Sequence, residues 1–231
     1  MKKYFKIINL IIGTVLICET IYPKNFESLM KELEKKDATI AKIKADYKQT
    51  IIIVDLNQMY EIDSEFIFVF PDKLRIEITN PFKQSIVVNN RKLLIKNANE
   101  NIIYVTNVEK YFSDNINIFP LIFSKDQKYN ISELVKKTGL KFVNEEEEHY
   151  VLSTRYAKGK TYKDKKVGLR EGETRFIMWI DKKTLFPKKV DMISEKYIIE
   201  TELKNYSTDF ETNEEFFDIK KSSETKIIEL K

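Results

Sequence analysis

From residue 47 onward the chain is dominated by short segments in which apolar and polar residues alternate. In residues 74–79, "LRIEIT", every second residue is apolar. Such alternation is typical of a β-strand with one buried and one hydrated face. Segments of this kind, separated by turn residues, predict a sheet of about ten strands. The eleven candidate segments are residues 47–54, 59–70, 74–79, 85–88, 93–96, 102–108, 140–143, 150–153, 175–180, 188–195 and 197–206.

Short turns join most of these segments, so we expect each strand to pair antiparallel with the one before it. Pro71 and Pro81 mark two of the turns, and Asn89-Asn90 predicts a tight hairpin, since asparagine tolerates a positive φ. A sheet of this size tends to curl or close into a barrel or half-barrel. The tail residues 227–230 are a candidate closing strand.

Residues 66–70, "FIFVF", break the alternation because they are apolar on both faces. An antiparallel sheet normally buries one face only. Two explanations are open at this stage. Either protein covers both faces of this strand, or one of its faces meets an apolar ligand.

Two helices are predicted on the sheet. Residues 25–43 place apolar side chains at spacings of three and four, with a short break at residues 37–39. Residues 130–139 carry a second helix signature, in which Asn130 is the N-cap, Glu133 follows three residues later and Gly139 ends the helix. An apolar loop or short helix, residues 117–126, precedes it.

The N-terminus has the features of a secretory signal peptide. Three lysines precede an apolar run at residues 7–17, which is short for a membrane span. We therefore expect residues 1–20 to be a signal peptide and residues 21–231 to form a single exported domain. An uncleaved anchor is the alternative, and lipidation of Cys18 is another, although Ile17 stands where lipidation signals usually carry a small residue.

The net charge and the side-chain chemistry argue against several classes of function. Residues 1–18 hold three lysines and no acid, so the rest of the chain has a net charge of only +1, and nucleic acid is not an expected partner. The sole histidine, His149, follows four glutamates at an expected hairpin tip, and no phosphate loop or nucleophile motif is present. We therefore expect no enzyme activity, no metal and no cofactor. Residues 155–170 form a basic loop, either passively solvated or able to dock an acidic partner.

The order of these features resembles the LolA-type outer-membrane lipoprotein carriers and their relatives among periplasmic lipid-binding domains. The resemblance rests on the N-terminal helix leading to "ADYKQT", on "FPDKLRIEITNPFKQSIVVNNRKLLI", and on "MWIDKKTLFPKKVDM" before "FFDI". It covers residues 26–219. It implies an α+β fold in which a strongly curved antiparallel sheet forms an unclosed half-barrel, with helices capping an apolar cavity.

The resemblance also implies a function. Such a protein takes the acyl chains of lipoproteins or lipids into its cavity in the periplasm. It receives them from an inner-membrane ABC transporter complex and passes them to an outer-membrane receptor. The expected cavity lining is apolar, and the residues that we assign to it are Phe66, Phe68, Phe70, Leu74, Ile76, Val88, Phe176 and Met178.

One departure from the family pattern concerns the lid of the cavity. Characterised carriers have an arginine just before the turn proline, which holds the lid shut. Here Phe70 occupies that position and Arg75 lies on the next strand, so this lid interaction does not carry over. A membrane-anchored lipoprotein of the same fold, acting as a lipoprotein receptor or an envelope sensor, is therefore the alternative to a carrier.

Overall fold

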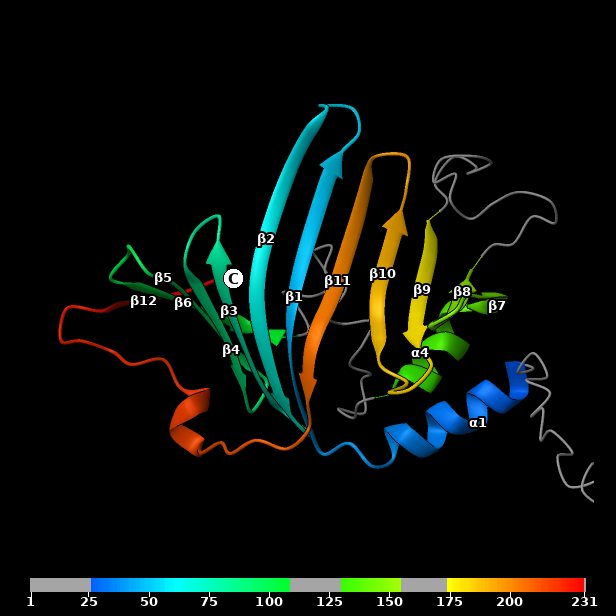
Figure 1. Ribbon diagram of the computed structural model, residues 1–231. Coiled ribbons are helices and arrows are strands. Elements are labelled where there is room, and N and C mark those ends of the chain that lie inside the picture. The colour runs from blue at the N-terminus through cyan, green and yellow to red at the C-terminus, as the bar shows by residue number, and fades with distance from the viewer. Residues whose placement is uncertain (1–25, 109–129, 155–173, 231) are drawn as a thin grey trace, which may run out of the picture.

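A computed structural model describes residues 26–108, 130–154 and 174–230 of the chain (Figure 1). Twelve strands form one sheet in the order β12-β6-β5-β4-β3-β2-β1-β11-β10-β9-β8-β7. Their bounds are β1 Lys42–Ile53, β2 Gln58–Val69, β3 Lys73–Asn80, β4 Gln84–Asn89, β5 Lys92–Asn97, β6 Ile102–Asn107, β7 Lys141–Glu145, β8 His149–Ser153, β9 Arg175–Asp181, β10 Pro187–Ile193, β11 Tyr197–Ser207 and β12 Lys226–Glu229.

The sheet grows outward from β1 on both sides. Antiparallel pairs lead from β1 through β2 to β6 on one side, and from β11 through β10 to β7 on the other. The last strand, β12, pairs with β6 in parallel orientation. The curved sheet therefore ends at β12 and β7 and stays open. The predicted α+β half-barrel is confirmed, with twelve strands in place of about ten, and the tail strand extends one edge and does not close the sheet.

The first helix is shorter than the sequence pattern predicted. Helix α1 spans Phe26–Asp37, and strand β1 begins at Lys42. The prediction of a helix to residue 43 was wrong because Ile40 and Ile43 also satisfy helical spacing. In the structure Ile43 instead lies on β1, on the same face as Ala45 and Tyr47, and all three are buried.

The second described helix follows its predicted caps. Helix α4 spans Ile131–Thr138. The Asn130 side chain accepts a hydrogen bond from the backbone N–H of Glu133 at 2.8 Å. Gly139 ends the helix with a φ of 70°, a conformation that favours glycine. These local signals are independent of the rest of the fold, which explains why the sequence predicted them.

The two helices are joined directly to each other. The Asp37 carboxylate accepts a hydrogen bond from the backbone N–H of Ser132 at 2.8 Å. Lys136 forms an ion pair with Glu34, with 2.6 Å between Nζ and Oε1. Burial raises the pKa of Asp37, and the hydrogen bonds from Ser132 and Ile131 oppose that rise. The C-terminus of α1 thus caps the N-terminus of α4.

Both faces of the "FIFVF" strand are covered by protein. We call the face that packs on α1 and α4 the inner face, and the opposite one the outer face. Phe66 and Phe68 lie in the inner apolar cluster, which also contains residues of both helices. Ile67 lies in an outer cluster with Phe217 and Ile219. Residues 208–225, which we call the C-terminal segment, thus supply the second cover, including the short 3₁₀ helix η2 at Glu214–Phe217.

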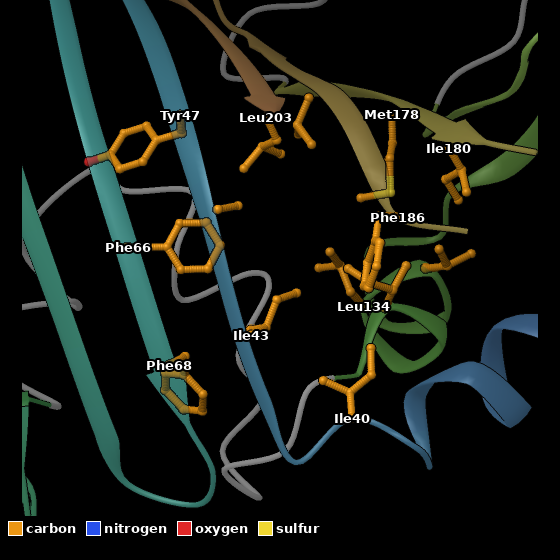
Figure 2. Packing of buried hydrophobic residues seen from close by; sticks show 14 of the residues in the cluster. Ile40, Ile43, Tyr47, Phe66, Phe68, Leu134, Met178, Ile180, Phe186 and Leu203 are labelled. Carbon is orange, nitrogen blue, oxygen red and sulfur yellow. The ribbon is translucent and has the colours of Figure 1, made fainter. Parts of the chain in front are cut away.

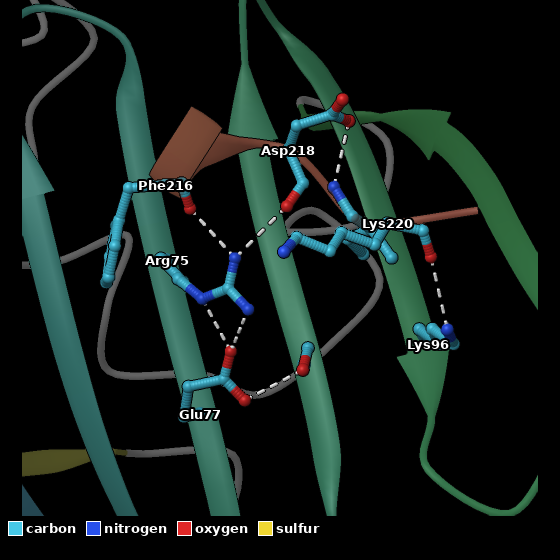
Figure 3. A network of polar contacts seen from close by, with 8 residues as sticks. Arg75, Glu77, Lys96, Phe216, Asp218 and Lys220 are labelled. Atoms are coloured by element: carbon cyan, nitrogen blue, oxygen red, sulfur yellow. Dashed lines mark hydrogen bonds and ion pairs between the residues drawn. The ribbon is translucent and has the colours of Figure 1, made fainter. Parts of the chain in front are cut away.

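The C-terminal segment is fixed to the outer face by polar contacts around Arg75 (Figure 3). The Arg75 guanidinium donates to the carbonyl oxygens of Phe216 at 2.8 Å and Asp218 at 3.2 Å. It also pairs with Glu77 at 2.5 Å and lies over the Phe216 ring, 5.2 Å from its centroid. Arg75 therefore lies on the outer face of the sheet, opposite the expected lining residues, and binds the C-terminal segment there.

Candidate functional site

The inner face carries the largest apolar cluster among the described residues. It contains 28 buried residues, each at most 8% exposed. Helices α1 and α4 contribute six of them, Leu29, Met30, Leu33, Ile131, Leu134 and Val135. Nineteen come from strands β1 to β5 and β8 to β11. Figure 2 shows the side chains of Phe66 and Phe68 from β2 on the same side of the sheet as Met178 and Ile180 from β9.

All eight expected lining residues lie in this cluster or against it. The buried members are Phe66, Phe68, Leu74, Ile76, Val88 and Met178, and Phe70 and Phe176 are partly buried and packed against them. The strand register explains the grouping. Phe68 lies opposite Leu74, and Leu74 lies opposite Val88, so these three side chains form a row across β2, β3 and β4. The structure brings these residues together, and their contact with a ligand stays a prediction.

Phe70, which stands in the position of the family arginine, has a packing role. Its ring contacts the Phe68 ring edge to face, with 4.2 Å between centroids. Phe70 therefore extends the apolar inner face just past the end of β2 and provides no charged group there. The charged groups near this turn contact the C-terminal segment on the outer face, as Arg75 does with the carbonyl oxygens of Phe216 and Asp218.

The sequence patterns did not predict several residues of the inner face. In β1, Ile43 and Ala45 are buried on this face beside Tyr47, although the predicted helix extended to residue 43 and the predicted strand began only at residue 47. Residue Phe186, in the turn between β9 and β10, stacks on Tyr206 with 4.5 Å between ring centroids. The alternation in "KIKADYKQ" was the available signal for β1. No local signal marks Phe186, because only the sheet register brings it to Tyr206.

Groups that could support catalysis or metal binding are sparse in the described residues. His149 opens β8 at the β7–β8 hairpin and pairs with Asp181 across the ladder. No group of three His, Cys, Asp or Glu side chains in residues 26–108, 130–154 and 174–230 could hold a metal ion. Within the same residues, no helix is both long enough and apolar enough to cross a bilayer.

Several predicted features lie outside the described residues. They are the signal peptide at residues 1–20 with Cys18, the apolar segment at residues 117–126, and the basic loop at residues 155–170. Their assignments stay predictions.

The model of one protein family matches most of the chain. The family, described as "Outer membrane lipoprotein carrier protein LolA", matches residues 38–220. This range begins after α1 and includes β1 to β11, η2 and Arg75. No curated protein matches the sequence.

Solved structures resemble the chain at low sequence identity. An uncharacterised conserved protein from Thermus thermophilus is 10% identical, with a TM-score of 0.51, and the match covers 88% of this chain and 98% of that one. A LolA superfamily protein from Nitrosomonas europaea is 11% identical, with a TM-score of 0.44, over 84% and 97% of the two chains. A putative outer-membrane lipoprotein-sorting protein domain from Vibrio parahaemolyticus is 9% identical, with a TM-score of 0.39, over 82% and 94%.

Proposed function

The chain belongs to the LolA family of outer-membrane lipoprotein carrier proteins, and we propose that it binds the acyl chains of lipoproteins or lipids on its inner face. The observation that carries this proposal is the size of the apolar surface on that face. The sheet alone supplies 19 of the 28 buried residues of the inner cluster. Both aromatic rings and methionines line it, and such side chains adapt to flexible chains.

The energetics of an acyl chain suit a site without specific polar chemistry. Each buried CH₂ contributes about 0.8 kcal/mol, so a chain of ~16 carbons gains on the order of 12 kcal/mol before costs. The inner-face residues are already buried against one another and against α1 and α4. A ligand must therefore displace part of this packing, which lowers the net affinity and allows release.

The transfer of lipoproteins from the inner to the outer membrane is part of the same proposal, and membership of the family supports it. The protein acts in the periplasm without catalysis, receiving its cargo from an inner-membrane ABC transporter complex. It transfers the cargo to a receptor at the outer membrane. The family is described as outer-membrane lipoprotein carrier proteins, which supports a binding function over an enzymatic one.

Two neighbouring residues of β9 provide a matched test of the binding face. Met178 lies in the inner cluster and Ile177 on the outer face, and each is 1% exposed. Either residue replaced by alanine should destabilise the protein by a similar amount, about 2–5 kcal/mol. Only Met178→Ala should change the affinity for a fluorescent acyl lipid, measured by titration. Equal affinities for the two variants, or no acyl lipid bound by the purified wild-type protein, would overturn the proposal.

A membrane-anchored receptor or sensor of the same fold is the second candidate, because Cys18 follows an apolar run. Mass spectrometry of the mature N-terminus separates the two functions. A diacylated Cys18 would exclude a freely diffusing carrier, whereas cleavage after residue 18 would exclude the lipid anchor. Acyl-lipid binding to the inner face is expected in both cases.

A further inference from the structure

Three polar side chains interrupt the apolar inner face on its three central strands. They are Gln49 on β1, Ser64 on β2 and Thr201 on β11, and they are 7%, 7% and 2% exposed. They share the inner face with Phe66 and Tyr47, since side chains two residues apart on a strand point the same way. Polar groups so deeply buried normally have hydrogen-bond partners.

Two of the three side chains are hydrogen-bonded to each other. Gln49 and Thr201 lie directly opposite in the β1–β11 ladder, and Gln49 Nε2 donates to Thr201 Oγ1 at 3.1 Å. The third side chain differs. Ser64 Oγ is buried and has no hydrogen-bond partner in the structure. An unpaired buried hydroxyl destabilises a protein unless it acquires a partner.

The strand register places Ser64 beside the Gln49–Thr201 pair. Ser64 lies opposite Tyr47, and Gln49 is two residues further along β1 on the same face. Ser64 and Gln49 are therefore diagonal neighbours, about 7 Å apart in an antiparallel ladder. The three side chains form one small polar patch within the apolar cluster.

This polar patch is neutral. The charged side chains of the surrounding strand positions lie on the outer face, where Lys48 pairs with Glu61 at 3.2 Å and Lys44 with Glu65 at 2.6 Å. Hydroxyl and amide groups can donate to a carbonyl oxygen, but they do not neutralise a carboxylate. A buried anion without a cationic partner is strongly disfavoured. The patch therefore suits an ester or amide carbonyl and disfavours a free fatty acid.

We propose that Ser64, Gln49 and Thr201 form a subsite for the ester carbonyl of a diacylglyceryl group whose acyl chains lie on the inner face. This inference rests on the proposed function and names the chemical class of the cargo. Ser64 Oγ donates the hydrogen bond that it lacks in the ligand-free protein. The acyl chains extend along β2 from Ser64 past Phe66 and Phe68, toward the end of the sheet near α1 and α4, and the polar end faces the β1–β2 hairpin (Figure 1).

An ester and an ether analogue isolate the carbonyl. A diacylglycerol and a dialkylglycerol of equal chain length differ at this position by the carbonyl oxygens, while their apolar area is nearly the same. The wild-type protein should bind the ester about tenfold more tightly, as one hydrogen bond from a buried hydroxyl predicts. Ser64→Ala should remove most of this preference and leave the affinity for the ether unchanged.

The controls separate this subsite from the proposed function. Thr50→Val changes a half-buried hydroxyl on the outer face of β1 and should keep the full ester preference. A paired variant, Gln49→Leu with Thr201→Val, replaces both partners and should reduce the preference without leaving an unpaired group. Equal wild-type affinity for ester and ether, or tighter binding of a free fatty acid, would overturn the subsite while acyl binding stands. Failure of all of these lipids to bind would instead overturn the proposed function.

Discussion

Replacing Arg75 with alanine should loosen the C-terminal segment where it packs on the outer face of the sheet. The Arg75 guanidinium holds two backbone carbonyl oxygens of that segment, those of Phe216 and Asp218, and stacks on the Phe216 ring. These contacts join residues that are more than 140 positions apart in sequence. Lys73 and Asn89 also hold this segment, through Glu214 and the carbonyl oxygen of Phe217, so Arg75→Ala removes only part of its attachment.

The magnitude follows from the contacts that disappear. A hydrogen bond that involves a charged group contributes about 1.5–3 kcal/mol, and the longer of the two contacts is at the weak end of that range. The Arg75 side chain is 22% exposed, so solvent screening reduces the total only in part. We expect Arg75→Ala to lower the free energy of unfolding by about 3 kcal/mol. For a chain of this length each kcal/mol lowers the midpoint of thermal unfolding by about 2–4 °C.

Two assays test this prediction. Urea unfolding followed by circular dichroism gives the free energy, and the rate of trypsin cleavage after Lys220 reports local release of the C-terminal segment. Lys92→Ala, an exposed change on β5, is the control and should stay within about 0.5 kcal/mol of wild type. An Arg75→Ala protein with wild-type stability and wild-type cleavage at Lys220 would refute the assignment of Arg75 as the clamp of this segment.

Four further changes are predicted by the same physical reasoning. Phe217→Ala removes a ring that packs on the outer face and is only 2% exposed. This change should lower the free energy of unfolding by about 3–5 kcal/mol, measured by urea unfolding. Ser64→Ala should leave the ligand-free protein as stable as wild type or more stable in thermal unfolding, because the lost hydroxyl has no partner; a loss above about 1 kcal/mol would contradict this. Gly139→Ala forces alanine into a positive φ and should cost about 1 kcal/mol. Burial raises the pKa of Asp37, so its folded state holds a proton more tightly than its unfolded state. Wild-type stability relative to Asp37→Asn should therefore fall as the pH rises from about 4 through the raised pKa; a difference that grows with pH would contradict the sign.

The sequence predicted elements whose signals are local. The caps of α4 and the alternation of β3 depend on a few adjacent residues, and the structure has both. The end of α1 was predicted wrongly because Ile40 and Ile43 fit either a helix or a strand. Pairing with β2 and β11 decides between these two structures, and that pairing depends on residues distant in the sequence.

The apolar run at residues 66–70 shows why the candidate site was only partly predictable. Its second apolar face was consistent with a ligand, but Ile67 packs in the cluster of Phe217 and Ile219, so protein covers it. Apolar residues in a strand reveal that a face is buried and do not reveal by what. The inner face carries the same ambiguity, and polar residues resolve it better than apolar ones. A buried hydroxyl with no partner, such as Ser64, is difficult to explain as core packing alone, whereas a carbonyl-bearing acyl ligand on the same face would satisfy it.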